Sequence, residues 1–164
     1  LADSQAAAHH RGCPSDINDL LQQLADERAC ERLVLRYTHL VDCGDAAAIA
    51  DLFTDDGEWR TDQFEMRGRQ AIADGFTRRQ GVTRRQSRHV CTNVIITVEG
   101  DTATGLCYLV NYRHDSQTGV AEKPAPADVP KFVGEYHDSF VRTEDGWRIS
   151  DRYCDMAFVR ESRR

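Results

Sequence analysis

The chain is 164 residues long, 40% of them hydrophobic, and its formal net charge at pH 7 is −6. A chain of this length and composition can form one domain with a substantial core, in which about 70% of the unfolded surface becomes buried. The acidic balance excludes nucleic acid as the main partner, because phosphate binding requires a concentrated positive surface.

Cysteine usage and hydropathy predict the compartment. Six cysteines occur at positions 13, 30, 43, 91, 107 and 154, and no two of them form a C-x-x-C pair. We therefore expect no metal site and a reduced, cytoplasmic protein. No apolar run approaches the roughly 18 residues of a membrane span, so we expect no membrane contact. Residues 1–14 contain no hydrophobic signal core and predict a loose N-terminal arm, followed by a single domain over 15–164.

The first predicted element is a long helix over about 16–43. Ser15 is a good N-cap, and apolar residues recur at helical spacing from Ile17 onwards. The helix could break near Ala25, where charged residues become frequent. Gly44 can adopt the left-handed conformation that ends a helix.

A second helix, a hairpin and a third helix are predicted next. Residues 45–53 predict a short helix capped by its first residue, an aspartate. Residues 54–57, Thr-Asp-Asp-Gly, are typical of a turn. Residues 58–62 and 64–67 predict the two strands of a hairpin, and residues 69–76 predict a helix.

The segment 78–88 is polar and strongly basic. Its five arginines are Arg78, Arg79, Arg84, Arg85 and Arg88. The simpler interpretation is a solvated helix end followed by a loop. The alternative is the rim of a cavity, where positive charge attracts an anionic substrate.

The C-terminal half predicts a sheet. Four long strands joined mostly by tight turns are expected over 87–98, 102–113, 131–142 and 147–156. Alternation places His89, Cys91, Asn93, Ile95 and Thr97 on one face of the first strand. Residues 114–130 hold three prolines and predict a long loop. Together these elements predict an α+β domain, in which N-terminal helices pack on a strongly curved, mostly antiparallel sheet that can wrap them and leave an apolar pocket.

Asp42 is the most informative polar residue of the first helix. It lies in the last turn, where the helix dipole presents its negative end and disfavours a carboxylate by about 0.3–1 kcal/mol. We therefore expect Asp42 to point into the cavity and to pair with a histidine further along the chain.

Four stretches carry a resemblance to a known family. They are RYTHLVDCGDAAAIADLFTDDGEW, MRGRQAIADGF, SRHVCTNVIITVEGDTATGLCYLV and GEYHDSFVRTEDGWRISDR. In order and spacing they resemble the nuclear transport factor 2-like (NTF2-like) superfamily, a cone of helices against a bent sheet, and within it the SnoaL-like branch. This branch includes scytalone dehydratase, a bile-acid 7α-dehydratase and a hexachlorocyclohexane dehydrochlorinase. These are lyases that need no cofactor and use a His–Asp dyad inside the cone.

The resemblance implies roles for five residues of this chain. Asp42 ends the long helix and His89 opens the first long strand, the places where the branch carries its dyad. Tyr37 matches a pocket tyrosine of the dehydratases and is expected to take part in catalysis together with His89 and Asp42. Asn111 falls where some members carry a polar residue, and Arg152 resembles a pocket arginine of the dehydrochlorinase. Both are expected to bind substrate.

These residues suit an elimination reaction on a small apolar ring substrate. A histidine titrates near working pH and can remove a proton from carbon, while a carboxylate on its other ring nitrogen fixes the tautomer. A tyrosine hydroxyl can assist the leaving group. The resemblance also implies a homo-oligomer, a trimer or a dimer.

Two alternatives remain open from the sequence. The stretch before the hairpin also resembles ketosteroid isomerase, whose base is an aspartate in the following short strand; here Asp62 is the candidate. The second alternative is a non-catalytic module that binds a ligand, or the small β subunit of a ring-hydroxylating dioxygenase. Such a subunit has no need of the His–Asp pair.

Overall fold

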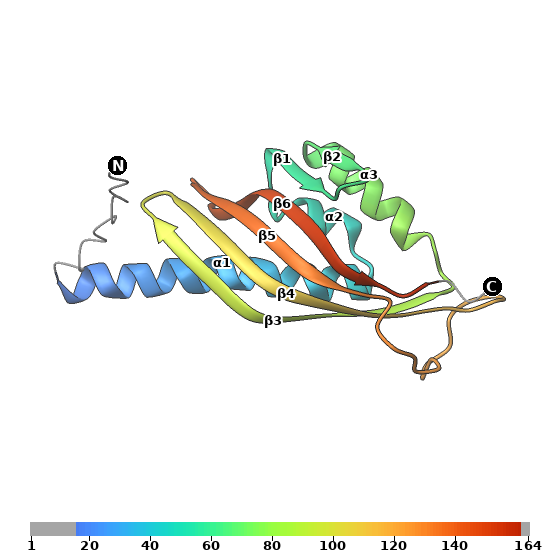
Figure 1. Ribbon diagram of the computed structural model, residues 1–164. Coiled ribbons are helices and arrows are strands. Elements are labelled where there is room, and N and C mark those ends of the chain that lie inside the picture. Colours follow the sequence, from blue (N-terminus) through green and yellow to red (C-terminus); the bar gives the residue numbers. More distant parts are fainter. Residues whose placement is uncertain (1–15, 162–164) are drawn as a thin grey trace, which may run out of the picture.

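Figure 1 shows a computed structural model that describes residues 16–161, so the predicted arm over residues 1–14 lies outside them. The helices are α1 (Ile17–Cys43), α2 (Ala46–Ala50) and α3 (Arg69–Gln80). The strands are β1 (Phe53–Arg60), β2 (Glu65–Arg67), β3 (Arg85–Glu99), β4 (Thr102–Asp115), β5 (Phe132–Thr143) and β6 (Gly146–Val159).

α1 is one continuous helix of 27 residues. The side chain of Asp16 caps it by accepting hydrogen bonds from the backbone N–H groups of Asn18 and Asp19, at 2.7 and 2.9 Å. Gly44 ends it with φ of 83°, a conformation that favours glycine. The long helix is confirmed, and the break that the sequence left open near Ala25 does not occur, because the helix contains no glycine or proline and accommodates its charged residues.

The segment after α2 differs from the prediction. α2 ends at Ala50 and β1 begins at Phe53, so the predicted turn over 54–57 lies within a strand. β1 pairs with β6 on both sides of this segment, and the register shifts between Phe53 and Glu58. The extra residues are taken up as a bulge, so pairing with β6 overrides the local turn preference of the Thr-Asp-Asp-Gly sequence.

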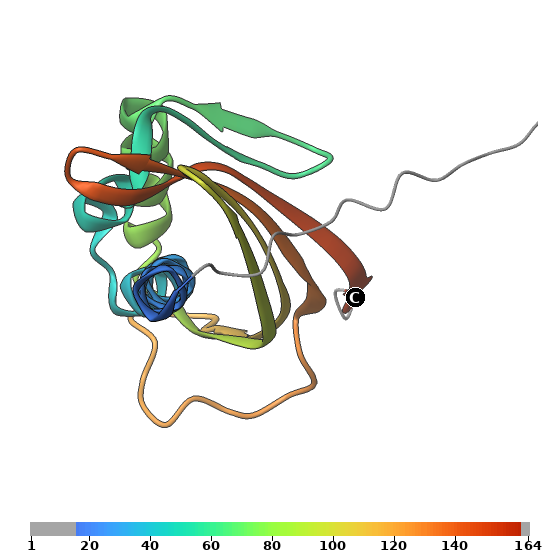
Figure 2. The same ribbon diagram turned by 90° about the vertical axis from the view of Figure 1, so that its left-hand side faces the viewer.

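The six strands form one sheet in the order β2-β1-β6-β5-β4-β3. Every neighbouring pair is antiparallel except β1 and β6, which run parallel. Viewed along α1, the sheet curves around the helix (Figure 2). α2 and α3 lie near the edge of the sheet that β1 and β2 form. In the described sheet the outer strands β2 and β3 do not pair with each other, so helices complete the cone instead of a closed ring of strands. The predicted α+β architecture is confirmed.

A bulge in β3 changes which side chains face the core. The register with β4 shifts between Thr92 and Ile95, and Asn93 has φ of 53°. His89 lies before the bulge and faces the interior, as predicted. Beyond it the prediction is wrong, because one extra residue inverts the alternation: Ile95 is 60% exposed, while Ile96 packs against the core.

The core fills the space between α1 and the concave face of the sheet. Within residues 16–161, no helix combines the length and the apolar character that crossing a membrane requires.

Candidate active site

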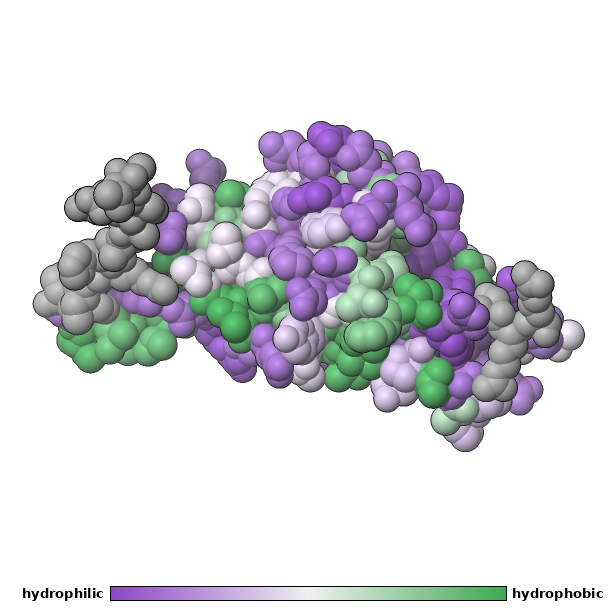
Figure 3. Space-filling model, in the orientation of Figure 1, coloured by the Kyte–Doolittle hydropathy of each residue, from purple (hydrophilic) through white to green (hydrophobic). Residues whose placement is uncertain are grey.

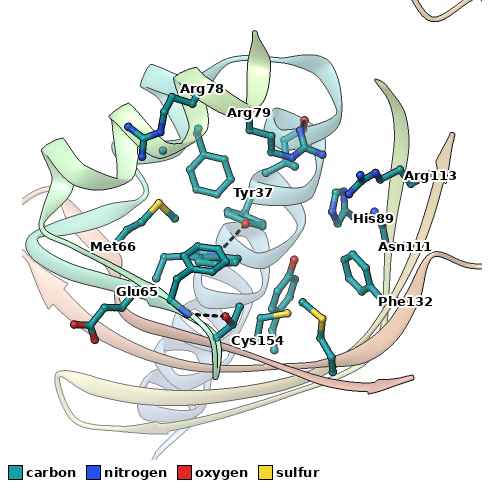
Figure 4. A pocket seen from close by; sticks show the side chains of 18 of the residues that line it. Tyr37, Glu65, Met66, Arg78, Arg79, His89, Asn111, Arg113, Phe132 and Cys154 are labelled. Atoms are coloured by element: carbon teal, nitrogen blue, oxygen red, sulfur yellow. Dashed lines mark hydrogen bonds between the residues drawn. The ribbon is translucent and has the colours of Figure 1, made fainter. Parts of the chain in front are cut away.

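A cavity of about 470 Å³ lies inside the cone (Figure 4). The C-terminal half of α1, the β1–β2 hairpin, α3 and the inner face of the sheet all contribute to its wall. Its apolar lining consists of Val41, Trp59, Phe64, Met66, Phe76, Phe132, Cys154 and Met156. Polar and charged side chains join them from several elements. This size and this mixed lining are typical of a site for a small organic ligand.

His89 and Asp42 meet at the edge of this cavity. His89 Nδ1 lies 2.7 Å from Asp42 Oδ1, although the two residues are 47 positions apart in the chain. Their side chains are only 8% and 7% exposed, and His89 lines the cavity. Because an ionised carboxylate can only accept, the neutral tautomer that fits this contact carries its proton on Nδ1 and its lone pair on Nε2.

Asp42 is held by more than the imidazole. Its Oδ2 accepts from the backbone N–H of His89 at 2.7 Å, and its Oδ1 also accepts from Ser87 Oγ at 3.0 Å. Burial raises the pKa of the Asp42 carboxyl. The two hydrogen bonds and the charge of His89, together with the hydrogen bond from Ser87, lower it by more, so the pKa lies below its ordinary value. Asp42 is therefore ionised at neutral pH.

Arg79 extends this network on the helix side. Its Nη2 donates to Ser87 Oγ at 3.0 Å, and its Nη1 donates to the carbonyl of Val41 at 2.8 Å. The order Arg79, Ser87, Asp42, His89 thus links α3 to β3 through the end of α1. The sequence did not identify Ser87, although its place two residues before His89 on an alternating strand puts both on one face.

Tyr37 lies in the wall of the cavity, 2% exposed. Its hydroxyl accepts a hydrogen bond from Trp59 Nε1 at 2.8 Å, which leaves its own proton available. Burial is the main reason that the pKa of Tyr37 rises to about 12, so the hydroxyl stays protonated and can act as a donor.

Tyr136 is a second tyrosine of the lining, which the sequence did not single out. Its ring meets that of Tyr37 edge to face at 5.8 Å. It is 2% exposed, and its hydroxyl has no hydrogen-bond partner within the described residues. Burial raises its pKa well above the ordinary value, so it too is a neutral donor. The sequence signal that could have identified it is the alternation of Tyr136, Asp138 and Phe140 along β5, which puts these three side chains on one face.

Asn111 lies directly opposite His89 in the register of β3 and β4. It is 1% exposed and lines the cavity, and its Oδ1 is buried without a hydrogen-bond partner among residues 16–161. A buried carbonyl oxygen left unpaired costs about 1–3 kcal/mol. An unpaired acceptor beside the imidazole suits a ligand that brings a donor.

The structure places Arg152 differently from the expectation. Arg152 does not line the cavity; it is 0% exposed and forms two hydrogen bonds of 2.7 and 2.6 Å to Asp138. Its guanidinium lies 4.2 Å from the ring centroid of Tyr37 and 4.4 Å from that of Tyr136. The expected substrate contact is corrected accordingly: Arg152 supports the two tyrosines from behind, because its position on β6 directs it towards Asp138 on β5.

Asp62 also lies away from the cavity. Its carboxylate is exposed and accepts a hydrogen bond from the Tyr153 hydroxyl, and it is not among the lining residues. Among residues 16–161, no group of three His, Cys, Asp or Glu side chains is arranged to hold a metal ion.

Comparison with known proteins supports the resemblance. A family model described as a SnoaL-like domain matches residues 22–153. The chain belongs to the SnoaL-like domain family. No curated protein matches it.

Several solved structures resemble this SnoaL-like chain. An NTF2-like protein with a cystatin-like fold from Novosphingobium aromaticivorans is 31% identical, with a TM-score of 0.73; the match covers 87% of this chain and 91% of that one. Rv3472 from Mycobacterium tuberculosis, of unknown function, is 26% identical over 84% of this chain and 79% of that one, with a TM-score of 0.70. A candidate scytalone dehydratase from N. aromaticivorans is 20% identical, with a TM-score of 0.73; the match covers 88% of this chain and 93% of that one. At this identity the likeness shows a shared fold.

Proposed function

We propose that this SnoaL-like chain is a cofactor-independent lyase that removes a carbon-bound proton from a small, mostly apolar ring substrate. The observation that carries the proposal is the 2.7 Å contact between His89 Nδ1 and Asp42 Oδ1 at a largely apolar cavity of about 470 Å³. It leaves a single unprotonated imidazole nitrogen at a site where a ring can bind.

In the proposed reaction, His89 Nε2 takes the proton from carbon. The electrons of the broken C–H bond form a double bond to the neighbouring carbon, and the leaving group departs from that carbon as hydroxide or halide. The negative charge of Asp42 stabilises the imidazolium that forms. A hydroxide leaving group takes a proton and departs as water, and Tyr37 is the proposed donor or orienting group.

The test is elimination by purified protein on a panel of hydroxylated and halogenated ring compounds, followed by NMR without added cofactor. We expect His89→Ala and Asp42→Asn each to lower the rate by about 10²–10⁴-fold, the usual contribution of a general base and its positioning. Circular dichroism should show both variants folded.

His137→Ala is the matched control. His137 lies on β5 with a side chain 47% exposed, away from the cavity lining, so its loss should leave the rate unchanged. Wild-type rates in either the His89 or the Asp42 variant would refute the mechanism.

The alternatives predict different outcomes. An isomerase that uses Asp62 as base requires Asp62→Asn to be the damaging change, although this carboxylate is exposed and bonded to Tyr153. A small dioxygenase subunit should co-purify with a large iron–sulfur partner and turn over nothing alone. One structure with 27% identity and a TM-score of 0.67 is described as a candidate aromatic ring hydroxylase. The buried His–Asp pair favours the lyase.

A further inference from the structure

We infer that the ring substrate carries a carboxylate, which binds to Arg113 beside His89 at the rim of the cavity, while Arg78 adds positive charge from the helix side of the hollow. The inference rests on the proposed function only in taking this cavity as the substrate site. Of the two interpretations of the basic segment 78–88, the inference favours the rim of a cavity that attracts an anionic substrate over a solvated helix end and loop.

The cavity lining is rich in arginine. Arg78 and Arg79 contribute to it from α3, Arg85 from β3 and Arg113 from β4. The described lining contains one carboxylate, Glu65, which is 3.1 Å from Arg67. A chain whose net charge is −6 therefore lines this cavity mostly with positive charge.

Neighbouring acidic groups neutralise this charge only in part. Arg85 and Arg113 share a single carboxylate, Asp115, through contacts of 2.8 Å from Arg85 Nε, 2.9 Å from Arg113 Nε and 2.5 Å from Arg113 Nη2. Burial raises the pKa of Asp115, but the two arginines lower it to about 2, so it stays charged. One carboxylate between two guanidinium groups leaves one positive charge in excess.

Arg78 adds a second charge. Its side chain is exposed at the rim, and its guanidinium has no hydrogen bond or ion pair within residues 16–161. Its neighbour Arg79 uses two of its nitrogens on the network around Asp42. Figure 4 shows Arg78 and Arg79 on the helix side of the hollow and Arg113 beside His89 on the sheet side.

The strand register fixes where a bound anion lies relative to the base. Arg113 is opposite Ser87, and Asn111 is opposite His89, so Arg113 and His89 are diagonal neighbours on the inner face. Diagonal neighbours lie about 7–8 Å apart, within reach of long side chains. An anion on Arg113 therefore lies on the same face as the imidazole, where the apolar lining can hold the ring.

A carboxylate suits this rim better than a more highly charged group. A guanidinium binds a carboxylate through two parallel hydrogen bonds, which also fix its orientation. A phosphate brings up to two negative charges to a site where the Asp115 carboxylate already contacts Arg113. The excess of positive charge matches a singly charged anion on an apolar body.

Ligand binding tests the inference without requiring turnover. Benzoate, cyclohexanecarboxylate and naphthoate, each paired with its neutral primary amide, can be titrated by calorimetry and by tryptophan fluorescence, since Trp59 lines the cavity. We expect at least one carboxylate to bind tenfold or more tightly than its amide, with a preference that weakens as salt is raised. Arg78→Gln and Arg113→Gln should each reduce this preference several-fold, while amide affinity stays unchanged.

Arg84→Gln is the matched control. It removes the same charge from the same segment, but Arg84 is exposed and does not line the cavity. Arg78→Gln keeps the test valid if Arg113→Gln misfolds, because Arg78 has no partner to lose within the described residues. Equal affinity for every acid and its amide, absence of binding by all six probes, or an equal effect of Arg84→Gln would overturn the inference.

The outcomes separate this inference from the proposed function. Selective carboxylate binding without elimination on the panel would refute the lyase and leave the anion site. Elimination from neutral rings that bind as tightly as the acids would refute the anion site and leave the lyase.

Discussion

Asp42 accepts three hydrogen bonds at the end of a helix whose dipole disfavours a carboxylate. The dipole cost is about 0.3–1 kcal/mol, whereas each hydrogen bond to a charged group contributes about 1.5–3 kcal/mol. The balance therefore favours the charged form, and the same contacts orient His89. The Asp42 side chain thus joins the end of α1 to the first residues of β3, the longest described strand.

Asn111 is the residue whose substitution should separate stability from activity. Because its buried Oδ1 has no partner within residues 16–161, we expect Asn111→Leu to raise the free energy of unfolding by about 1 kcal/mol, or to leave it unchanged. If this oxygen receives a donor from the substrate, kcat/KM should fall about tenfold or more. Urea denaturation and steady-state kinetics measure the two effects. A variant with full activity would exclude Asn111 from substrate binding.

Resemblance and alternation together could predict the pair His89 and Asp42, because both lie at element ends that the sequence defines clearly. Their catalytic role stays a prediction. Alternation indicates which strand faces Ser87 and Tyr136 share with other residues, but their place in the site also depends on which strand pairs with which and in what register. Arg152 shows the same limit, because only the pairing of β6 with β5 directs it to Asp138.

At the scale of elements, Asp26 fastens α1 to the far end of the sheet. It is 5% exposed, and Arg142 of β5 binds both its carboxylate oxygens at 2.8 and 2.6 Å. Trp147 Nε1 donates to it at 2.9 Å and Gln22 Nε2 at 3.1 Å. The hydrogen bond from Arg142 is the largest cause that lowers the pKa of Asp26 far below its ordinary value.

We expect Asp26→Ala to lower the free energy of unfolding by about 2–3 kcal/mol at pH 7, because it leaves a partly buried guanidinium and an indole N–H unpaired. Since the folded pKa is depressed, this stabilisation is complete above the unfolded pKa, near 4, and is lost as the pH falls towards the folded pKa. The difference between the variant and wild type should therefore shrink below pH 4. Urea denaturation across pH 2–7 measures it.

Asp101→Ala is the matched control for Asp26. It removes the other carboxylate on Arg142, at 2.9 Å, but its side chain is 83% exposed. An exposed ion pair contributes less than about 1 kcal/mol, so this variant should stay close to wild type. Equal losses in both variants would show that burial does not strengthen the Asp26 contact.

The long elements were predicted well because their periodicity extends over many residues and burial enforces it. α1 and the four long strands were each placed within about three residues of their observed ends. The failures concentrate at bulges, in β1 after Phe53 and in β3 after Thr92. A bulge depends on the pairing partner, which local sequence does not specify.

At the scale of the whole molecule, the outer face of the sheet is unusually apolar. Side chains that alternate with the buried ones of β3–β6 include Val90, Ile95, Tyr108, Tyr112 and Phe158, which are 43%, 60%, 47%, 48% and 71% exposed. Figure 3 shows hydrophobic groups in the middle of this face, with hydrophilic groups among them and along the upper edge. Contiguous apolar surface of this kind marks interfaces in soluble proteins.

We therefore expect this face to pack against further copies of the chain as a dimer or trimer. Light scattering after gel filtration should give two or three times the chain's mass. Tyr108→Lys combined with Phe158→Lys should shift it to a monomer, because charges without partners would be buried. Leu21→Lys, on an α1 residue that is 57% exposed and away from the sheet, should leave the mass unchanged. A monomeric wild type would refute this expectation, because a stable interface usually buries about 800 Å² per copy.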